Sequence, residues 1–131
     1  MECTKLLYEY LGDLIVLDVG GATTDLHSVT VESDQVARLM ISPEPKAKRT
    51  VEGDLGVYVN RWKVVESIGE EKLREQCREQ GFSMEHALET YRAIPKTEEE
   101  VKLVELLTRE AVVKAAERHA GRLRYIYGPS G

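Results

Sequence analysis

The chain has 131 residues, of which 42% are hydrophobic and 31% charged, and its formal net charge is -5 at pH 7. This length suits one domain with a modest core, and the composition is that of a soluble globular protein. An acidic chain without a basic run interleaved with aromatic residues is not expected to bind nucleic acid.

Membrane and redox signals are equally sparse. The N-terminus has no signal-peptide pattern, and the longest apolar run, residues 14–17, is far shorter than the roughly 20 residues that span a bilayer. Cys3 and Cys77 lie outside any metal-ligand or CxxC spacing and are predicted to be free thiols. We therefore expect a cytoplasmic protein with no membrane partner.

Residues 13–41 carry strand signals and predict a three-stranded antiparallel meander. Leu14-Ile-Val-Leu17 is a continuous apolar run, which is typical of a strand buried on both faces and central in its sheet. Residues 23–31 are rich in β-branched side chains and predict the second strand. Turn residues at 32–34 then separate it from a third strand at 35–41, and residues 42–53 are expected to form a joining loop.

Residues 54–120 predict a helical region, and its first helix is expected to begin at Asp54 as N-cap and to end at Gly69. Within it, Trp62 is interpreted as a core anchor. The apolar stripe that supports this helix has three- and four-residue spacing and consists of Leu55, Tyr58, Val59, Trp62 and Val65.

Three further helices are predicted after Gly69. Residues 70–80 favour a short, solvated helix, and the next begins after Ser83 and stops by Pro95. The strongest signal is the capping box Thr97-Glu-Glu-Glu100, which predicts a helix to about Ala120 with a length of about 35 Å. Such a helix could cover a whole sheet, and residues 121–131 then form either a further strand or a tail.

The string Asp18-Val-Gly-Gly-Ala-Thr-Thr-Asp25 joins the first two predicted strands and has the residue types of a phosphate site. Gly20, Gly21 and Ala22 expose backbone N–H groups that an anion can approach closely. Thr23 and Thr24 add hydroxyl donors, one of which should face the same side as these amides.

Asp18 and Asp25 flank this turn and would repel a bound polyphosphate, so a Mg²⁺ ion is expected there, held by one or two of these carboxylates together with phosphate oxygens. Asp18 could also orient the water that attacks a γ-phosphate. The alternative is an ordinary hairpin, because Gly, Asp and Thr are also frequent in turns without ligands. His27 could point into the same cleft or simply pack, while His86 and His119 have no ligand partner and receive no metal role.

The string from Asp18 to Asp25 resembles the second phosphate motif of the acetate kinase, sugar kinase, Hsp70 and actin superfamily. The resemblance implies an α/β, ribonuclease H-like (actin-like ATPase) lobe with ATP and Mg²⁺ as cofactors. It places Asp18 near the metal, the amides of residues 20–22 on the phosphates, Thr23 near the γ-phosphate and Asp25 in the outer shell of the metal.

A narrower resemblance, carried by residues 13–28, 48–56 and 118–122, is to the MutL (GlmL) family of glutamate mutase operons. It implies an ATP-dependent chaperone or reactivating factor for an adenosylcobalamin-dependent mutase. It also implies that Gly53, at the start of a helix, faces the nucleotide phosphates, although Gly53 could equally be a turn residue and Asp54 only a cap. The neighbouring basic pair 48–49 reaches a phosphate or is merely solvated.

The superfamily's first phosphate motif and its adenosine motif are not found in this sequence. We therefore expect residues 1–131 to be a single partial domain with an incomplete sheet, which alone binds ATP weakly or not at all, is inactive, and self-associates through an exposed apolar interface. Its expected partners are the remainder of its own protein and the mutase. The alternatives are a lobe of a hydantoinase or acyl-phosphate kinase relative, and a non-catalytic interaction module that keeps the fold.

Overall fold

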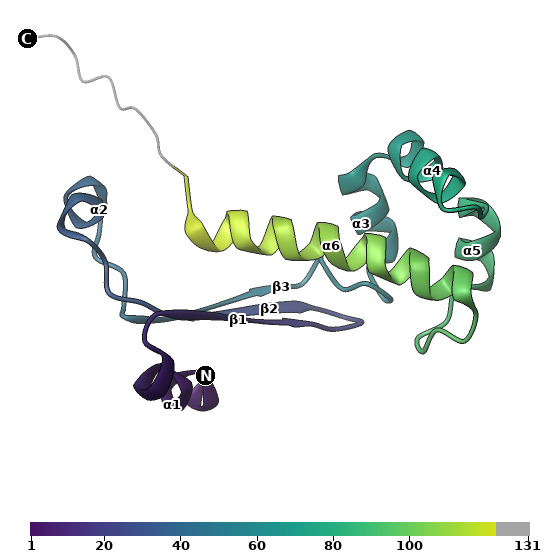
Figure 1. The fold of residues 1–131 in the computed structure, drawn as a ribbon. Coiled ribbons are helices and arrows are strands. Elements are labelled where there is room, and N and C mark those ends of the chain that lie inside the picture. Colours follow the sequence, from purple (N-terminus) through teal and green to yellow (C-terminus); the bar gives the residue numbers. More distant parts are fainter. Residues whose placement is uncertain (123–131) are drawn as a thin grey trace, which may run out of the picture.

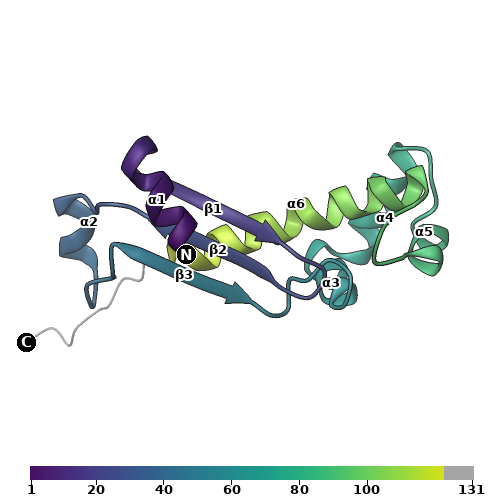
Figure 2. The same ribbon diagram turned by 90° about the horizontal axis from the view of Figure 1, so that it is seen from below.

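The computed structural model describes residues 1–122, which form a three-stranded antiparallel sheet and six helices. The long helix α6 (Glu98–Ala120) lies along one face of the sheet, and α1 (Glu2–Leu11) lies on the other face (Figures 1 and 2). The three helices between residues 61 and 90 gather around the N-terminal half of α6 (Figure 1). The architecture is therefore α/β, with α6 joining the sheet to the helical end of the molecule.

The sheet has the order β1-β2-β3, formed by Leu14–Val19, Thr24–Val29 and Ala47–Glu52. In β2, Thr24, Leu26 and Ser28 are buried on the face that α6 covers. A three-stranded antiparallel meander was predicted, and the pairing of its first two strands around residues 20–23 is confirmed.

The third strand was predicted at residues 35–41, and this is wrong. Residues 34–39 form the short helix α2 (Asp34–Leu39), whose first turn is capped by the Ser33 hydroxyl accepting the N–H of Val36 at 3.4 Å. The strand forms instead within the expected joining loop, because its side chains find partners on α6. Lys48 Nζ donates to the carbonyl of His119 at 2.7 Å, and the Thr50 hydroxyl lies 2.8 Å from the His119 ring.

The first strand was predicted to be central and buried on both faces, and the structure corrects this too. β2 is the central strand, and β1 pairs with no second strand within residues 1–122. Ile15 and Leu17 are 56% and 38% exposed. The apolar run thus forms the expected strand, but within residues 1–122 some of its apolar side chains stay exposed.

Residues 1–12 carried no predicted element, yet they form α1, which packs against β1 and β2 and buries Thr4. The helix ends at Gly12, whose positive φ of 77° suits glycine. Its outer side leaves Leu7, Tyr10 and Leu11 exposed. The apolar residues of this segment recur at three- and four-residue spacing, which is the sequence signal that could have predicted the helix.

The helix predicted from Asp54 begins later than expected. α3 spans Arg61–Ile68 with Asn60 as its N-cap, and it ends at Gly69 as predicted. Trp62 is 58% exposed, so its assignment as a core anchor is wrong. Residues 53–60 do not join the helix, because residues 57–60 donate hydrogen bonds to the turn between β1 and β2.

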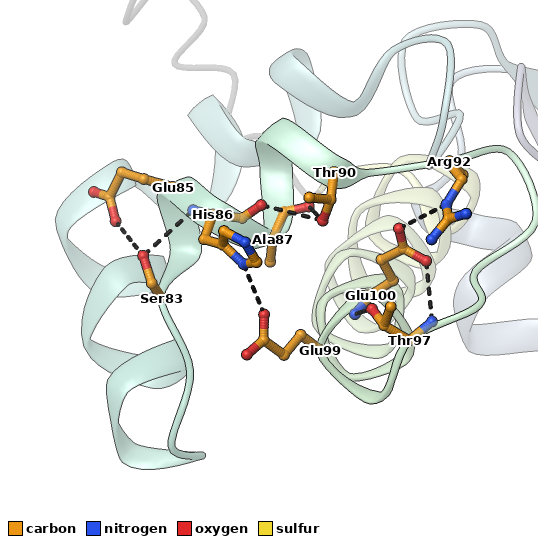
Figure 3. Close-up of polar contacts among 9 residues, drawn as sticks. All are labelled: Ser83, Glu85, His86, Ala87, Thr90, Arg92, Thr97, Glu99 and Glu100. Carbon is orange, nitrogen blue, oxygen red and sulfur yellow. Dashed lines mark hydrogen bonds and ion pairs between the residues drawn. The ribbon is translucent and has the colours of Figure 1, made fainter.

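The next two helices begin where they were predicted, although the second ends five residues before Pro95. α4 spans Glu70–Glu79, and α5 spans Met84–Thr90 with the Ser83 hydroxyl accepting the N–H of His86 at 3.3 Å (Figure 3). Cys77 is buried and Cys3 exposed, and both are free thiols as predicted. The apolar core is made by α3 to α6 together with Leu26 and the segment just before α3.

Figure 3 shows the predicted capping box at the start of α6. The N–H of Glu100 donates to the Thr97 hydroxyl at 3.2 Å, and the N–H of Thr97 donates back to Glu100 at 3.1 Å. The Glu100 carboxylate is fully buried and also accepts from the Lys96 N–H at 2.6 Å and Arg92 Nε at 3.0 Å. The Lys96 N–H is the main reason that the pKa of Glu100 lies below its usual value.

α6 ends at Gly121 with φ 81°, as predicted. The strand or tail was predicted at residues 121–131, of which residues 123–131 lie outside the described residues. No helix within residues 1–122 combines the length and apolar character needed to cross a membrane.

Candidate functional site

The turn at residues 20–23, here called the glycine turn, is held by residues 53–60, here called the clamp loop. The backbone carbonyls of the turn accept four hydrogen bonds from the clamp loop, three from backbone N–H groups and one from the side chain of Asn60. These are Val57 N–H to Gly20 O at 3.1 Å, Tyr58 N–H to Gly21 O at 3.0 Å, Val59 N–H to Gly21 O at 2.7 Å and Asn60 Nδ2 to Ala22 O at 2.9 Å.

This arrangement fixes where the amides of the turn point. In a trans peptide, the carbonyl of one residue and the N–H of the next point in opposite directions, and the described chain contains no cis peptide. Because the carbonyls of residues 20–22 face the clamp loop, the N–H groups of Gly21, Ala22 and Thr23 face away from it. Within residues 1–122, none of these three N–H groups donates a hydrogen bond.

The amide of Gly20 differs from the prediction. Its N–H donates to the Thr23 carbonyl at 2.9 Å and so closes the hairpin turn. The predicted set of donors therefore moves by one residue, to Gly21, Ala22 and Thr23.

Gly56 brings the clamp loop into direct backbone contact with the glycine turn. A Cβ atom at position 56 would lie 2.2 Å from both the carbonyl carbon and the carbonyl oxygen of Ala22. Only glycine allows this approach. The sequence reasoning gave Gly56 no role of its own, although it lies in the 48–56 segment that carried the family resemblance.

The side chains beside the turn lie on the sheet face opposite α6. Asp18 and Asp25 are directly paired across β1 and β2, so both carboxyl groups project from this face. Asp18 is exposed, and Thr23 donates its hydroxyl to Asp25 Oδ2 at 3.2 Å. The structure thus brings Asp18, Thr23 and Asp25 together beside the outward amides, as the sequence predicted.

Arg49, on β3, completes this group. Its Nη2 and Nε atoms donate to Asp25 Oδ1 at 2.5 and 3.1 Å, and this pairing holds the pKa of Asp25 below its usual value. Arg49 is thus bound to a carboxylate rather than merely solvated. His27 projects from the same face, two residues after Asp25, and burial lowers the pKa of its imidazole.

Two predicted ligand residues have structural contacts instead. Thr24 is fully buried on the α6 face and donates its hydroxyl to the Leu55 carbonyl at 2.8 Å, so only Thr23 keeps a hydroxyl beside Asp18. Gly53 lies in a turn, not at a helix N-terminus, and its carbonyl accepts from Asn60 at 2.7 Å. The turn alternative for Gly53 is therefore the one that the structure supports.

The opposite face of the sheet is anchored to the C-terminal end of α6. The buried ring of His119 lies 2.7 Å from the Ser28 hydroxyl and 2.8 Å from that of Thr50. Arg118 binds Asp54 at 2.6 and 2.9 Å, so Asp54 holds the clamp loop to α6 and does not cap a helix. Arg118 and His119 lie in the 118–122 segment that carried the family resemblance, and no local sequence pattern indicated the residues that they contact.

No cluster of three or more His, Cys, Asp or Glu side chains with metal-site geometry is found in the described part of the chain.

The sequence model of the MutL protein family matches residues 1–131. The chain belongs to this family. Protein MutL of Clostridium tetanomorphum is 39% identical in an alignment of 127 positions, which covers 92% of this chain and 28% of that relative. The resemblance seen in the sequence is thereby confirmed, and the chain spans 28% of the length of this MutL relative. No solved structure matches the chain significantly.

Proposed function

We propose that this chain is the phosphate-binding part of a MutL-family ATP-binding protein with a ribonuclease H-like, actin-type fold. The observation that carries the proposal is the outward direction of three successive N–H groups, at Gly21, Ala22 and Thr23, beside Asp18. Successive backbone amides in a turn form an anion-binding concavity, and they need no rearrangement because the clamp loop already holds them.

The charges around the turn support an anionic ligand paired with a cation. Arg49 neutralises Asp25, so Asp18 is the carboxylate left to face bound phosphate. One or two carboxylates with several waters and phosphate oxygens are the usual Mg²⁺ environment, and Mg²⁺ there would offset the phosphate charge. In this proposal Asp18 orients the water shell, Thr23 lies near the terminal phosphate, and Asp25 acts through Arg49 and Thr23.

The rest of the longer protein would supply the other walls of the site. The chain covers 28% of its relative, and the outer edge of β1 has no partner strand among residues 1–122. We propose that further strands extend the sheet at this edge and that the nucleotide base is bound by the remaining part. A ligand held by one wall loses most of its contacts, so this chain alone should bind Mg-ATP only at millimolar concentration.

For the whole protein we propose a cytoplasmic ATP-dependent chaperone or reactivating factor for an adenosylcobalamin-dependent mutase. Membership of the MutL family supports this role. ATP hydrolysis, with Asp18 as the residue that positions water, would drive the cycle of binding to the mutase and release from it.

The site is tested by titrating the ¹⁵N-labelled chain with Mg-ATP and with adenosine. We expect the amide signals of Gly21, Ala22 and Thr23 to shift with Mg-ATP, whereas Gly20, whose N–H is already bonded, shifts less. Asp18→Asn should weaken the Mg²⁺-dependent part of the shift. The absence of any shift from the folded chain at about 10 mM nucleotide, or equal shifts with adenosine, would refute the proposed site.

A further inference from the structure

A groove of about 460 Å³ lies at the helical end of the molecule, between α3 and α5 and beside the start of α4. Figure 1 shows these three helices gathered around the N-terminal half of α6. The clamp loop does not line this groove, and neither does the glycine turn.

The floor and one wall of the groove are apolar. Val65, Met84 and Leu88 form the floor and are 4%, 2% and 6% exposed, so they belong to the folded core. Trp62 stands beside them and is 58% exposed. A large aromatic side chain beside a preformed apolar depression is typical of the anchor residues of protein interfaces.

The rim of the groove is acidic on both sides. Glu66 on α3 and Glu70 at the start of α4 lie on one side, and Glu85 and Glu89 on α5 lie on the other. Arg74 pairs with Glu70 at 3.1 Å and with Glu85 at 2.5 Å. The carboxylates of Glu66 and Glu89 make no ion pair or hydrogen bond within residues 1–122, so the lining of the groove carries two uncompensated negative charges, one on α3 and one on α5.

We propose that this groove binds a basic amphipathic helix of a protein partner. Two helices with an apolar floor between them form the kind of groove that accepts the apolar face of a third helix. Lysine or arginine side chains on the flanks of that helix would pair with the carboxylates of Glu66 and Glu89, which have no partner within residues 1–122. A second copy of this chain is a poorer match, because the chain is itself acidic with a net charge of -5.

The test uses the fluorescence of Trp62, the single tryptophan of the chain. The probe is a synthetic helical peptide of about 18 residues, five helical turns, with a leucine face flanked by lysines. A second peptide keeps the leucine face and has glutamates in place of the lysines. We expect the lysine peptide to shift the Trp62 emission to the blue with a Kd of about 10 µM, and the glutamate peptide to bind at least about tenfold more weakly.

The charge contribution is isolated with matched variants. The double variant Glu66→Lys/Glu89→Lys should bind the lysine peptide at least about tenfold more weakly than the parent chain does. Glu75→Lys/Glu105→Lys makes the same change in net charge at exposed positions outside the groove, and it should weaken binding less than about threefold. All four positions are exposed, so both variants should fold, and circular dichroism checks this.

Three results would overturn the proposal. These are equal binding of the two peptides, equal weakening by the two double variants, and no Trp62 response to the lysine peptide at about 1 mM. A blue shift that grows with protein concentration alone, without peptide, would assign the groove to a second copy of the chain and would overturn it as well.

Discussion

Replacing Gly56 by alanine tests whether the clamp loop sets the conformation of the glycine turn. The added Cβ would lie 2.2 Å from the carbonyl carbon and oxygen of Ala22 and 2.6 Å from its Cα, all backbone atoms. The clamp loop must therefore move away from the turn. That movement weakens the three hydrogen bonds from the N–H groups of residues 57–59, each contributing about 1 kcal/mol. The expected loss in the free energy of unfolding is about 3 kcal/mol, the upper range for overpacking.

Urea unfolding, followed by circular dichroism, measures this loss against a control in the same loop. Gly53→Ala adds the same methyl group where nothing lies within 4 Å and where φ is not positive, so its unfolding free energy should change by less than about 0.5 kcal/mol. The Gly56→Ala chain should also lose the Mg-ATP shifts at residues 21–23. Equal stability of the two variants, or a Gly56→Ala chain within about 0.5 kcal/mol of the parent, would refute the close backbone contact.

Three further predictions follow from the anchoring of α6 and from the thiols. Arg118→Met should lower the unfolding free energy by about 1 kcal/mol at pH 7, because its ion pairs are partly exposed. Arg118 lowers the pKa of Asp54 from 3.8, so the difference in unfolding free energy between the parent and the Arg118→Met chain should shrink as the pH falls below about 4. Urea titrations across pH measure this difference. Burial lowers the pKa of His119 from 6.5, so the unfolded chain binds the proton more readily and stability should fall as the pH drops below about 6.5. His119→Gln should reduce that fall, leaving the part due to His27, and an unchanged pH profile would exclude His119 as a cause. With a thiol reagent at pH 8, only exposed Cys3 should react quickly, because burial raises the pKa of Cys77 to about 11, and two equally fast thiols would contradict the packing around α4.

The parts of the fold that sequence reasoning predicted are those specified by local chemistry. The capping box at Thr97 and Glu100 and the glycines at 69 and 121 fix helix ends through contacts within one turn of helix. The short helix predicted at residues 70–80 is α4, which spans Glu70–Glu79 and buries Leu73 and Cys77. Each of these signals lies within a few residues of the boundary that it sets.

The errors occurred where distant contacts decide the structure. Residues 47–52 are polar enough to be read as a loop, but Lys48 and Thr50 bind His119, some 70 positions away along the chain. Asp54 has the chemistry of an N-cap, yet its carboxylate binds Arg118 and the helix begins at Arg61. Local propensity is a weak prior against such tertiary contacts.

The same distinction explains how much of the candidate site could be foreseen. The string from Asp18 to Asp25 predicted a hairpin turn with glycine amides flanked by two carboxylates, and it left open whether Thr23 or Thr24 faces the same side as the amides. It could not tell which amides point outward, because that depends on hydrogen bonds from residues 57–60. Nor could it show that Thr24 is held by Leu55 on the far face.

Gly56 therefore belongs to the site as much as the glycines of the turn, although it would contact no ligand. The atoms that a side chain at position 56 would meet are the backbone atoms of Ala22, so no replacement of the Ala22 side chain could restore the space. Relief would require the backbone of the turn or of the clamp loop to move. Movement of either segment would break the hydrogen bonds that hold the carbonyls of residues 20–22. The three N–H groups would then no longer be fixed in one direction. The proposed phosphate site thus needs two segments about 35 residues apart, and the glycine of the second segment is the one that the turn motif alone does not reveal.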